Sequence, residues 1–271
     1  MNQPLTTLNN GISMPLLGLG VYDMVGLAAE RAVSKALEVG YRLVDTAMIY
    51  NNEREVGQAI RHSAVPRNEI FVTTKVWQND MGYEATLRAF ETSANKLDIG
   101  HIDLYLVHWP VRATRKETWR ALEKLYSEKR VRAIGVANYL MPFLQELELD
   151  WQVVPVVNQI EFSPWLFLKD ELNWCRAKNI VLQAYSPLVR GQKFLDPTLS
   201  AMAKKYEKTP AQIVLRWAIQ LGISTIPKSS NPSRIKENFN IFDFALIDED
   251  MAALSNLHEN YRVVEDPMDL L

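Results

Sequence analysis

The chain has 271 residues, a hydrophobic fraction of 48% and a formal net charge of −2. This length fits one large domain or two small ones, and the composition is that of a globular protein with a sizeable core. The balanced charge gives no broad basic surface, and no apolar run reaches the roughly 20 residues of a membrane helix, so we expect neither nucleic acid nor a membrane as a partner.

The cysteine and histidine content argues against a disulfide-stabilised protein and against a metal-binding protein. Cys175 is the only cysteine, so we expect no disulfide framework, and its setting LNWCRAKN predicts a helical, unreactive thiol. His62, His101, His108 and His258 lack metal-ligand spacing. The N-terminal residues lack the basic start and apolar block of a signal peptide. We therefore expect a cytoplasmic protein without a metal.

Short apolar, β-branched segments recur along the chain, and helical patterns separate them. The segments are 16–21, 41–47, 70–75, 102–109, 131–138, 156–161, 180–186 and 223–228. Residues 26–40 and 117–130 show the i, i+3, i+4 apolar spacing of one-sided helices, and Gly40 and Gly100 fall where helices are expected to stop. Alternation of strand and helix predicts a parallel sheet.

Eight such units in about 250 residues predict a (β/α)8 barrel, which we expect to form one domain over residues 1–271. An open doubly wound sheet is the rival fold, but GLGVYD (18–23) falls short of its G-x-G-x-x-G turn. An Asn-Gly step in LTTLNNGISMPL predicts an N-terminal β-hairpin that closes the bottom of the barrel. The polar tail after Asn260 is expected to fold over one end.

Polar residues follow the predicted strands at their carboxyl ends, where the chemistry of such barrels is located. They are Asp45, Lys75, His108, Asn138, Asn158, Gln159, Glu161, Tyr185, Ser186, Lys228 and Ser229. Burying a lone charge in a core costs several kcal/mol. Their common position therefore predicts a polar pocket at this end of the barrel.

The segment LVDTAMIYNNE (43–53) places Asp45 at a strand end and Tyr50 five residues later. A phenol has a pKa of about 10, and a nearby ammonium lowers it. We expect Lys75 to supply that ammonium, Asp45 to hold it, and His108 to donate a second hydrogen bond to the same substrate oxygen. Such a group suits an oxygen that gains charge as a carbonyl accepts hydride. Singly, each residue also has a plain structural explanation, as a cap, a packing ring, a surface lysine or a core histidine.

Six segments together carry a family resemblance. They are VDTAMIYNNEREVGQAI (44–60), TTKVW (73–77), DLYLVHWP (103–110), VVNQIEFSP (156–164), AYSPL (184–188) and IPKSSNPSRIKEN (226–238). In these segments the chain resembles the aldo-keto reductases, over about residues 5–267, and most of all bacterial reductases of the 2,5-diketo-D-gluconate and glyoxal or methylglyoxal type.

The resemblance implies a (β/α)8 barrel that binds NADPH without a Rossmann domain and transfers hydride to an aldehyde or ketone. By motif, Tyr50 matches the general acid, Lys75 and Asp45 its assistants, and His108 the residue that orients the carbonyl. The resemblance also implies that Tyr185 stacks on the nicotinamide, that Asn138 and Gln159 contact its carboxamide, and that Ser186 and Leu188 contact the pyrophosphate. Further implied cofactor contacts are Gly20, Val21 and Asp45.

KSSNPSRIKEN (228–238) also has a physical interpretation. Lys228, Ser229 and Arg234 offer donors suited to a phosphate, and Ser230 or Asn231 is expected near a helix N-terminus, which favours an anion. This pattern predicts NADPH over NADH, and the resemblance implies adenine contacts from Glu237 and Asn238. The structural alternative is a capped helix start with a solvated basic face.

Tyr22, Trp77 and Trp109 match positions that face the substrate, and aromatic walls predict an apolar, tolerant pocket. We expect small aldehydes and α-dicarbonyls as substrates, with keto-sugar acids as further candidates, and a monomeric enzyme. Ala137 replaces the usual serine, which removes one hydroxyl contact to the cofactor.

Two other functions stay open on the sequence alone. Lys75 would form a Schiff base in an aldolase-like barrel enzyme. A cofactor-sensing binding module, as in channel-associated members of the family, is the second alternative.

Overall fold

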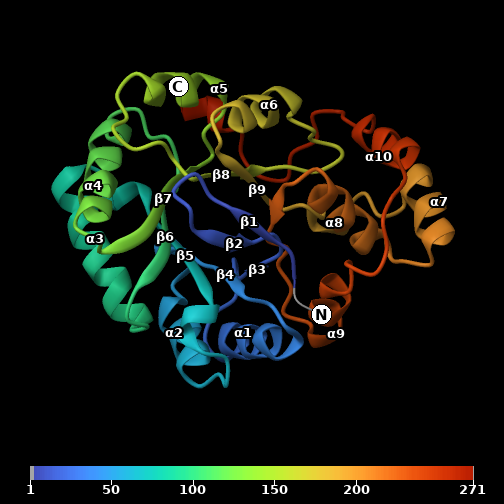
Figure 1. Ribbon diagram of the computed structural model, residues 1–271, viewed down its shortest axis with the longest axis horizontal. Coiled ribbons are helices and arrows are strands. Elements are labelled where there is room, and N and C mark those ends of the chain that lie inside the picture. The colour runs from blue at the N-terminus through green and yellow to red at the C-terminus, as the bar shows by residue number, and fades with distance from the viewer. Residues whose placement is uncertain (1–2, 271) are drawn as a thin grey trace.

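Eight parallel strands, in the order in which they occur along the chain, form a closed barrel in the computed structural model of the protein (Figure 1). The strands are β3 (Leu19–Gly20), β4 (Leu43–Asp45), β5 (Phe71–Val76), β6 (Ile102–Val107), β7 (Val131–Ala137), β8 (Val157–Glu161), β9 (Val181–Tyr185) and β10 (Ser224–Thr225). The barrel closes between its first and last strands, where Gly18 N donates to Thr225 O at 2.8 Å and Thr225 N to Leu16 O at 2.7 Å. This closure confirms the (β/α)8 barrel and excludes the open doubly wound sheet.

The structure describes residues 3–270, so residues 1–2 and 271 of the predicted domain lie outside it. Each predicted strand segment overlaps one observed strand. The helices are α1 (Leu27–Val39), α2 (Glu53–Arg61), α3 (Tyr83–Leu97), α4 (Arg115–Ser127), α5 (Met141–Glu148), α6 (Lys169–Ala177), α7 (Pro197–Tyr206), α8 (Pro210–Gln220), α9 (Pro232–Phe239) and α10 (Asp248–Ser255). They surround the barrel, as Figure 1 shows.

Helix ends explain where the sequence patterns succeeded and failed. Helix α1 buries the predicted stripe and stops at Gly40, whose φ of 124° suits glycine. Gly100 does not play this role, because α3 already ends at Asp98, which adopts a left-handed φ of 48°. Helix α4 begins and ends slightly earlier than the predicted range 117–130.

An antiparallel hairpin, β1 (Leu5–Thr7) with β2 (Ser13–Pro15), lies across the amino-terminal end of the barrel (Figure 1). Leu8 and Met14 are buried against the interior side chains at this end. The amide of Asn9 donates to Pro155 O at 3.0 Å, which ties the hairpin to the start of β8. The predicted hairpin at the bottom of the barrel is confirmed. Because it covers the amino-terminal end, a ligand would enter at the carboxyl ends of the strands.

A buried carboxylate joins three strands near the same end. Asp103 of β6 accepts hydrogen bonds from Val72 N (2.9 Å), Arg67 Nη2 (2.7 Å) and Arg132 Nη1 (2.6 Å), and His101 Nε2 lies 3.3 Å away. Burial by itself would raise the pKa of Asp103, but the bonds and charges of His101, Arg67 and Val72 outweigh it, so the pKa lies below its ordinary value.

We predict that Asp103→Asn destabilises the fold in a pH-dependent way. Because the folded-state pKa is lower than the unfolded one, the stabilisation is fully present above the unfolded pKa of about 3.9 and is lost as pH falls through the folded value. At pH 7 we expect the variant to lose about 2–3 kcal/mol of unfolding free energy, the range for hydrogen bonds to a charged group. Urea unfolding of the variant and the wild type measures this loss of unfolding free energy at pH 7 and near pH 3.

Glu91→Gln is the matched control, because Glu91 pairs with Arg130 while half-exposed, and such pairs contribute little. A loss for Asp103→Asn that stays constant between pH 7 and pH 3 would contradict the assignment.

Candidate active site

The carboxyl ends of the strands surround a cavity of about 1240 Å³. Almost all the residues predicted to form the site line it: Gly20, Tyr22, Asp45, Tyr50, Trp77, His108, Trp109, Asn138, Gln159, Tyr185, Ser186, Leu188, Lys228, Ser229, Ser230, Arg234, Glu237 and Asn238. They come from positions more than 200 residues apart in the chain, and the parallel barrel brings them to one end.

Four of the residues predicted at this end, Val21, Lys75, Asn158 and Glu161, do not line the cavity. Val21 is fully buried, its N–H donates to Asp45 O at 3.1 Å, and its carbonyl accepts from the amide of Asn52 at 2.9 Å. Its backbone groups are therefore used within the wall, and the predicted cofactor contact is not supported. Lys75 is also fully buried, directly behind Asp45.

Gly20 has a packing role besides its place in the wall. A Cβ at this position would lie 2.8 Å from Ile226 O, because the first and last strands approach closely where the barrel closes. The predicted glycine is therefore needed for barrel closure independently of any ligand.

Asp45 and Lys75 form an ion pair that solvent does not reach. Lys75 Nζ lies 2.6 Å from Asp45 Oδ1 and donates to Thr46 O at 2.8 Å, while Asp45 Oδ2 accepts from Gln159 Nε2 at 2.7 Å. Burial raises the pKa of Asp45 and lowers that of Lys75, and their mutual attraction opposes both shifts. The surrounding carbonyl and amide match an ammonium and a carboxylate, so we treat the pair as charged.

Tyr50 lies beside this pair. It ends the short 3-10 turn Met48–Tyr50, by which the loop after β4 folds back over the cavity as predicted. Lys75 Nζ lies 5.2 Å from the centre of the Tyr50 ring. The rings of Tyr50 and His108 meet edge to face with their centres 5.8 Å apart, and His108 meets Trp77 in the same way at 5.3 Å. The four predicted catalytic residues are thus brought together.

The expected lowering of the Tyr50 pKa is not found. Burial, and then the negative charge of Asp45, raise the pKa of Tyr50 well above its ordinary value. The expectation failed because Asp45 already neutralises the Lys75 ammonium, and because desolvation disfavours the phenolate. Burial, together with the Lys75 charge, also holds the pKa of His108 well below its usual value, so the imidazole is neutral at pH 7.

Hydrogen bonds fix the orientation of the amides beside the pair. Gln159 Nε2 donates to Asp45 Oδ2 and to Gln183 Oε1, both at 2.7 Å, which leaves the Gln159 carbonyl oxygen to accept. Asn138 donates to His108 O at 2.8 Å and accepts from the Tyr185 hydroxyl at 2.7 Å. This end of the cavity is therefore a rigid polar floor with aromatic side walls.

The other end of the cavity is cationic. Lys228 and Arg234 are exposed along its edge, and Asn231 caps α9, its side chain accepting from Ser233 N at 2.9 Å and Arg234 N at 3.2 Å. The Glu237 carboxylate accepts from Thr209 Oγ1 at 2.7 Å, which holds it at the cavity wall. Cations and a capped helix start favour an anion here.

Twelve lining residues were not predicted from the sequence. They are Asp23, Ile49, Pro187, Arg190, Gly191, Phe194, Ala211, Ile226, Pro227, Val263, Val264 and Glu265. Those in the 186–196 segment and the C-terminal tail have neither strand nor helix periodicity, so no pattern placed them. The tail does fold over the carboxyl end, as expected, but its individual contacts were not predictable from its composition.

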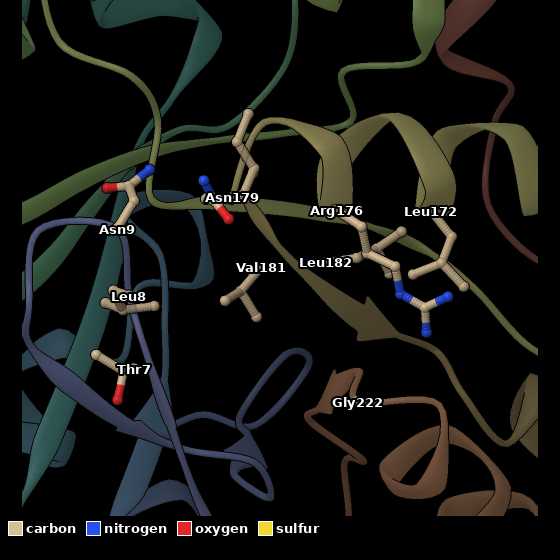
Figure 2. Close-up of a pocket in the computed structure, with 10 residues that line it drawn as sticks. Thr7, Leu8, Asn9, Leu172, Arg176, Asn179, Val181, Leu182 and Gly222 are labelled. Atoms are coloured by element: carbon tan, nitrogen blue, oxygen red, sulfur yellow. The ribbon is translucent and has the colours of Figure 1, made fainter.

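A second hollow of about 440 Å³ lies at the opposite end of the barrel, between the hairpin, α6 and β9 (Figure 2). Two of its polar side chains are already engaged: Asn9 donates to Pro155 O and Arg176 to Leu221 O. Far from the polar residues at the strand ends, this hollow is a gap between packed elements.

The chain is similar in sequence to known reductases. The chain matches the Aldo/keto reductase family over residues 26–259. A 9,11-endoperoxide prostaglandin H2 reductase of Trypanosoma cruzi is 49% identical over 98% of this chain and 95% of that protein. A glyoxal reductase of Bacillus subtilis is 47% identical over 97% of this chain and 96% of its own length.

Among solved structures, a Bombyx mori aldo-keto reductase in complex with NADP superposes with a TM-score of 0.91 at 34% identity, covering 98% of this chain and 96% of that one. The chain therefore belongs to the aldo/keto reductase family, and it is an oxidoreductase. The resemblance carried by the six sequence segments is confirmed.

Among residues 3–270, no cluster of three or more His, Cys, Asp or Glu side chains is suited to a metal ion, and no helix is long and apolar enough to cross a membrane. Cys175 is buried in α6, and burial raises the pKa of its thiol to about 12.

We predict that Lys75→Met costs about 3–5 kcal/mol of unfolding free energy, because it leaves Asp45 buried without its cation. The double variant Asp45→Asn/Lys75→Met is expected to recover most of that loss, since it removes both charges. Urea unfolding of the two variants and the wild type measures the difference. A single variant as stable as the wild type would show that the pair is not charged in the folded protein.

Proposed function

We propose that the protein reduces aldehydes and ketones to alcohols with NADPH, and that Tyr50 donates the proton. The observation that carries this proposal is the buried Asp45–Lys75 pair, which lies against Tyr50 and His108 in the wall of one large cavity. The family membership of the chain and its likeness to the NADP-bound Bombyx mori enzyme support the cofactor.

The residues of the cavity fit NADPH. Its volume of about 1240 Å³ exceeds the roughly 300–1,000 Å³ typical of a single small-molecule site, which leaves room for a cofactor and a carbonyl compound together. Asn138 and Gln159 would hold the carboxamide, Tyr185 would pack on the ring, and Lys228, Ser229 and Arg234 would bind the 2′-phosphate. When bound, NADPH supplies the hydride.

Tyr50 performs the proton transfer. Its raised pKa keeps the phenol protonated at pH 7, so the proton is in place before the reaction. The substrate oxygen becomes strongly basic only as the carbonyl accepts hydride, so it takes the proton from the phenol at that moment and does not require a lowered ground-state pKa of Tyr50. The Lys75 ammonium, 5.2 Å from the centre of the ring, offsets the Asp45 charge that would otherwise repel the phenolate that remains.

His108 orients the substrate. Its imidazole is neutral, because burial and the Lys75 charge lower its pKa, and so it donates one hydrogen bond instead of carrying a charge. Tyr50 and His108 together would hold the carbonyl oxygen between two donors, which fixes the carbon that receives hydride.

We infer small aldehydes and α-dicarbonyls as substrates, with keto-sugar acids as further candidates. Tyr22, Trp77 and Trp109 give the cavity aromatic sides, and Tyr22 is 57% exposed, so the substrate end is open. The glyoxal reductase among the relatives supports the α-dicarbonyl class. A monomeric state and a cytoplasmic location stay predictions from the sequence.

The two alternative functions lose support. A Schiff base needs an accessible amine, but Lys75 Nζ is fully buried and held by Asp45 and the Thr46 carbonyl. A binding module has no need of an ion pair aimed at a tyrosine, and such a buried pair is costly to form.

We predict that Tyr50→Phe lowers the rate of carbonyl reduction by roughly 10²–10⁴-fold, the usual contribution of a general acid, while NADPH still binds. NADPH oxidation with methylglyoxal, nitrobenzaldehyde and a keto-sugar acid measures the rate, and fluorescence titration measures binding. Tyr22→Phe is the control, since it removes a hydroxyl from the same cavity without touching Lys75. Wild-type protein that turns over none of the three carbonyls would contradict the proposal.

We predict that Arg234→Ala weakens NADPH binding by roughly 10- to 100-fold, the effect of losing a hydrogen bond between charged groups, and changes NADH binding little. Lys236→Ala is the matched control, because Lys236 is an exposed cation of the same helix that does not line the cavity. Equal losses for NADPH and NADH would place the 2′-phosphate elsewhere.

A further inference from the structure

A buried glutamate holds the C-terminal tail in place. Glu161, the last residue of β8, is 1% exposed and accepts hydrogen bonds from Val263 N at 2.6 Å and Val264 N at 3.2 Å. Val263 and Val264 line the cavity, whereas Glu161 does not. A carboxylate that receives two backbone N–H groups is a strong, charge-assisted anchor.

The same tail is bound to a second segment over the cavity, the loop of residues 186–196 between β9 and α7. The Tyr261 hydroxyl donates to Gln192, and Lys193 forms an ion pair with Glu259. Lys193 Nζ also lies 4.3 Å from the centre of the Tyr261 ring. The tail therefore contacts this loop on one side and Glu161 on the other.

The loop itself has a strained backbone. Val189 and Arg190 adopt left-handed φ values of 42° and 55°, and a β-branched residue is rare in this region. The Val189 side chain is fully buried in the main core, which compensates for the strain. Arg190, Gly191 and Phe194 line the cavity next to the tail residues. A loop held this way depends on its neighbours to stay in position.

We propose that Glu161 is a positioning residue that joins the tail and the 186–196 loop into one cover over the cavity, and that this cover slows the release of NADPH. Glu161 acts through the backbone of Val263 and Val264 and does not touch the ligand. The inference rests on the proposed binding of NADPH in this cavity. It extends that proposal by assigning the tail a role in cofactor retention.

The experiment compares Glu161→Gln with Tyr261→Phe and the control Glu91→Gln in the full-length protein. Stopped-flow fluorescence measures the rate of NADPH release, and hydrogen exchange measures the protection of the Val263 and Val264 amides without cofactor. Glutamine keeps the shape of Glu161 but loses the charge and turns an acceptor into a donor. We expect roughly tenfold faster release, corresponding to about 1.4 kcal/mol, together with faster exchange at both amides.

Tyr261→Phe leaves the Glu161 anchor intact and removes only the bond to Gln192, so it is expected to accelerate release by a smaller factor. It also keeps the inference testable if Glu161→Gln does not fold. The inference would be overturned if folded Glu161→Gln releases NADPH at the wild-type rate although its amides exchange faster. If Glu161→Gln does not fold, release at the wild-type rate from Tyr261→Phe overturns it. Either result leaves the proposed function standing. Failure of the wild-type protein to bind NADPH would instead overturn the proposed function.

Discussion

A lysine and an aspartate that lie 2.6 Å apart, both out of reach of solvent, determine the layout of the candidate active site. Each charge alone would be costly at this depth, so each needs the other, and the Thr46 carbonyl and the Gln159 amide satisfy what remains. The pair also shifts the pKa values of its neighbours. The Asp45 carboxylate helps to keep Tyr50 protonated, and the Lys75 ammonium helps to keep His108 neutral. Two neutral donors next to a buried cation suit an oxygen that becomes negative only during the reaction.

The barrel creates this arrangement through strand register. Asp45 of β4 is paired with Thr73 of β5, and Lys75, two residues further along β5, points to the same side. The hairpin and the Asp103 cluster stabilise the amino-terminal end of the barrel, where the buried polar groups hold the strands together. Stability and chemistry are thus separated along the barrel axis, and the anchored tail adds a cover at the chemical end.

Much of the fold was predictable because it rests on local patterns. β-Branched runs identified all eight strands, and eight of the eleven polar residues predicted at the strand ends line the cavity. The direction of the Tyr50 pKa shift was not predictable from the sequence. It depends on desolvation of the phenol and on the negative charge of Asp45, which offsets the positive charge of Lys75. The cofactor contact of Val21 stays a prediction, since its backbone groups already bond Asp45 and Asn52. Arg190, Gly191 and Phe194 of the 186–196 loop were missed, because no propensity predicts the left-handed backbone at Val189 and Arg190.

The most direct test is a crystal structure of the protein with NADP⁺ and an unreactive carbonyl analogue. We expect the carbonyl oxygen within about 2.6–3.2 Å of both the Tyr50 hydroxyl and a ring nitrogen of His108, with Lys75 still paired to Asp45 behind them. An analogue bound with its oxygen away from Tyr50, or a Tyr50 ring turned out of the cavity, would contradict it.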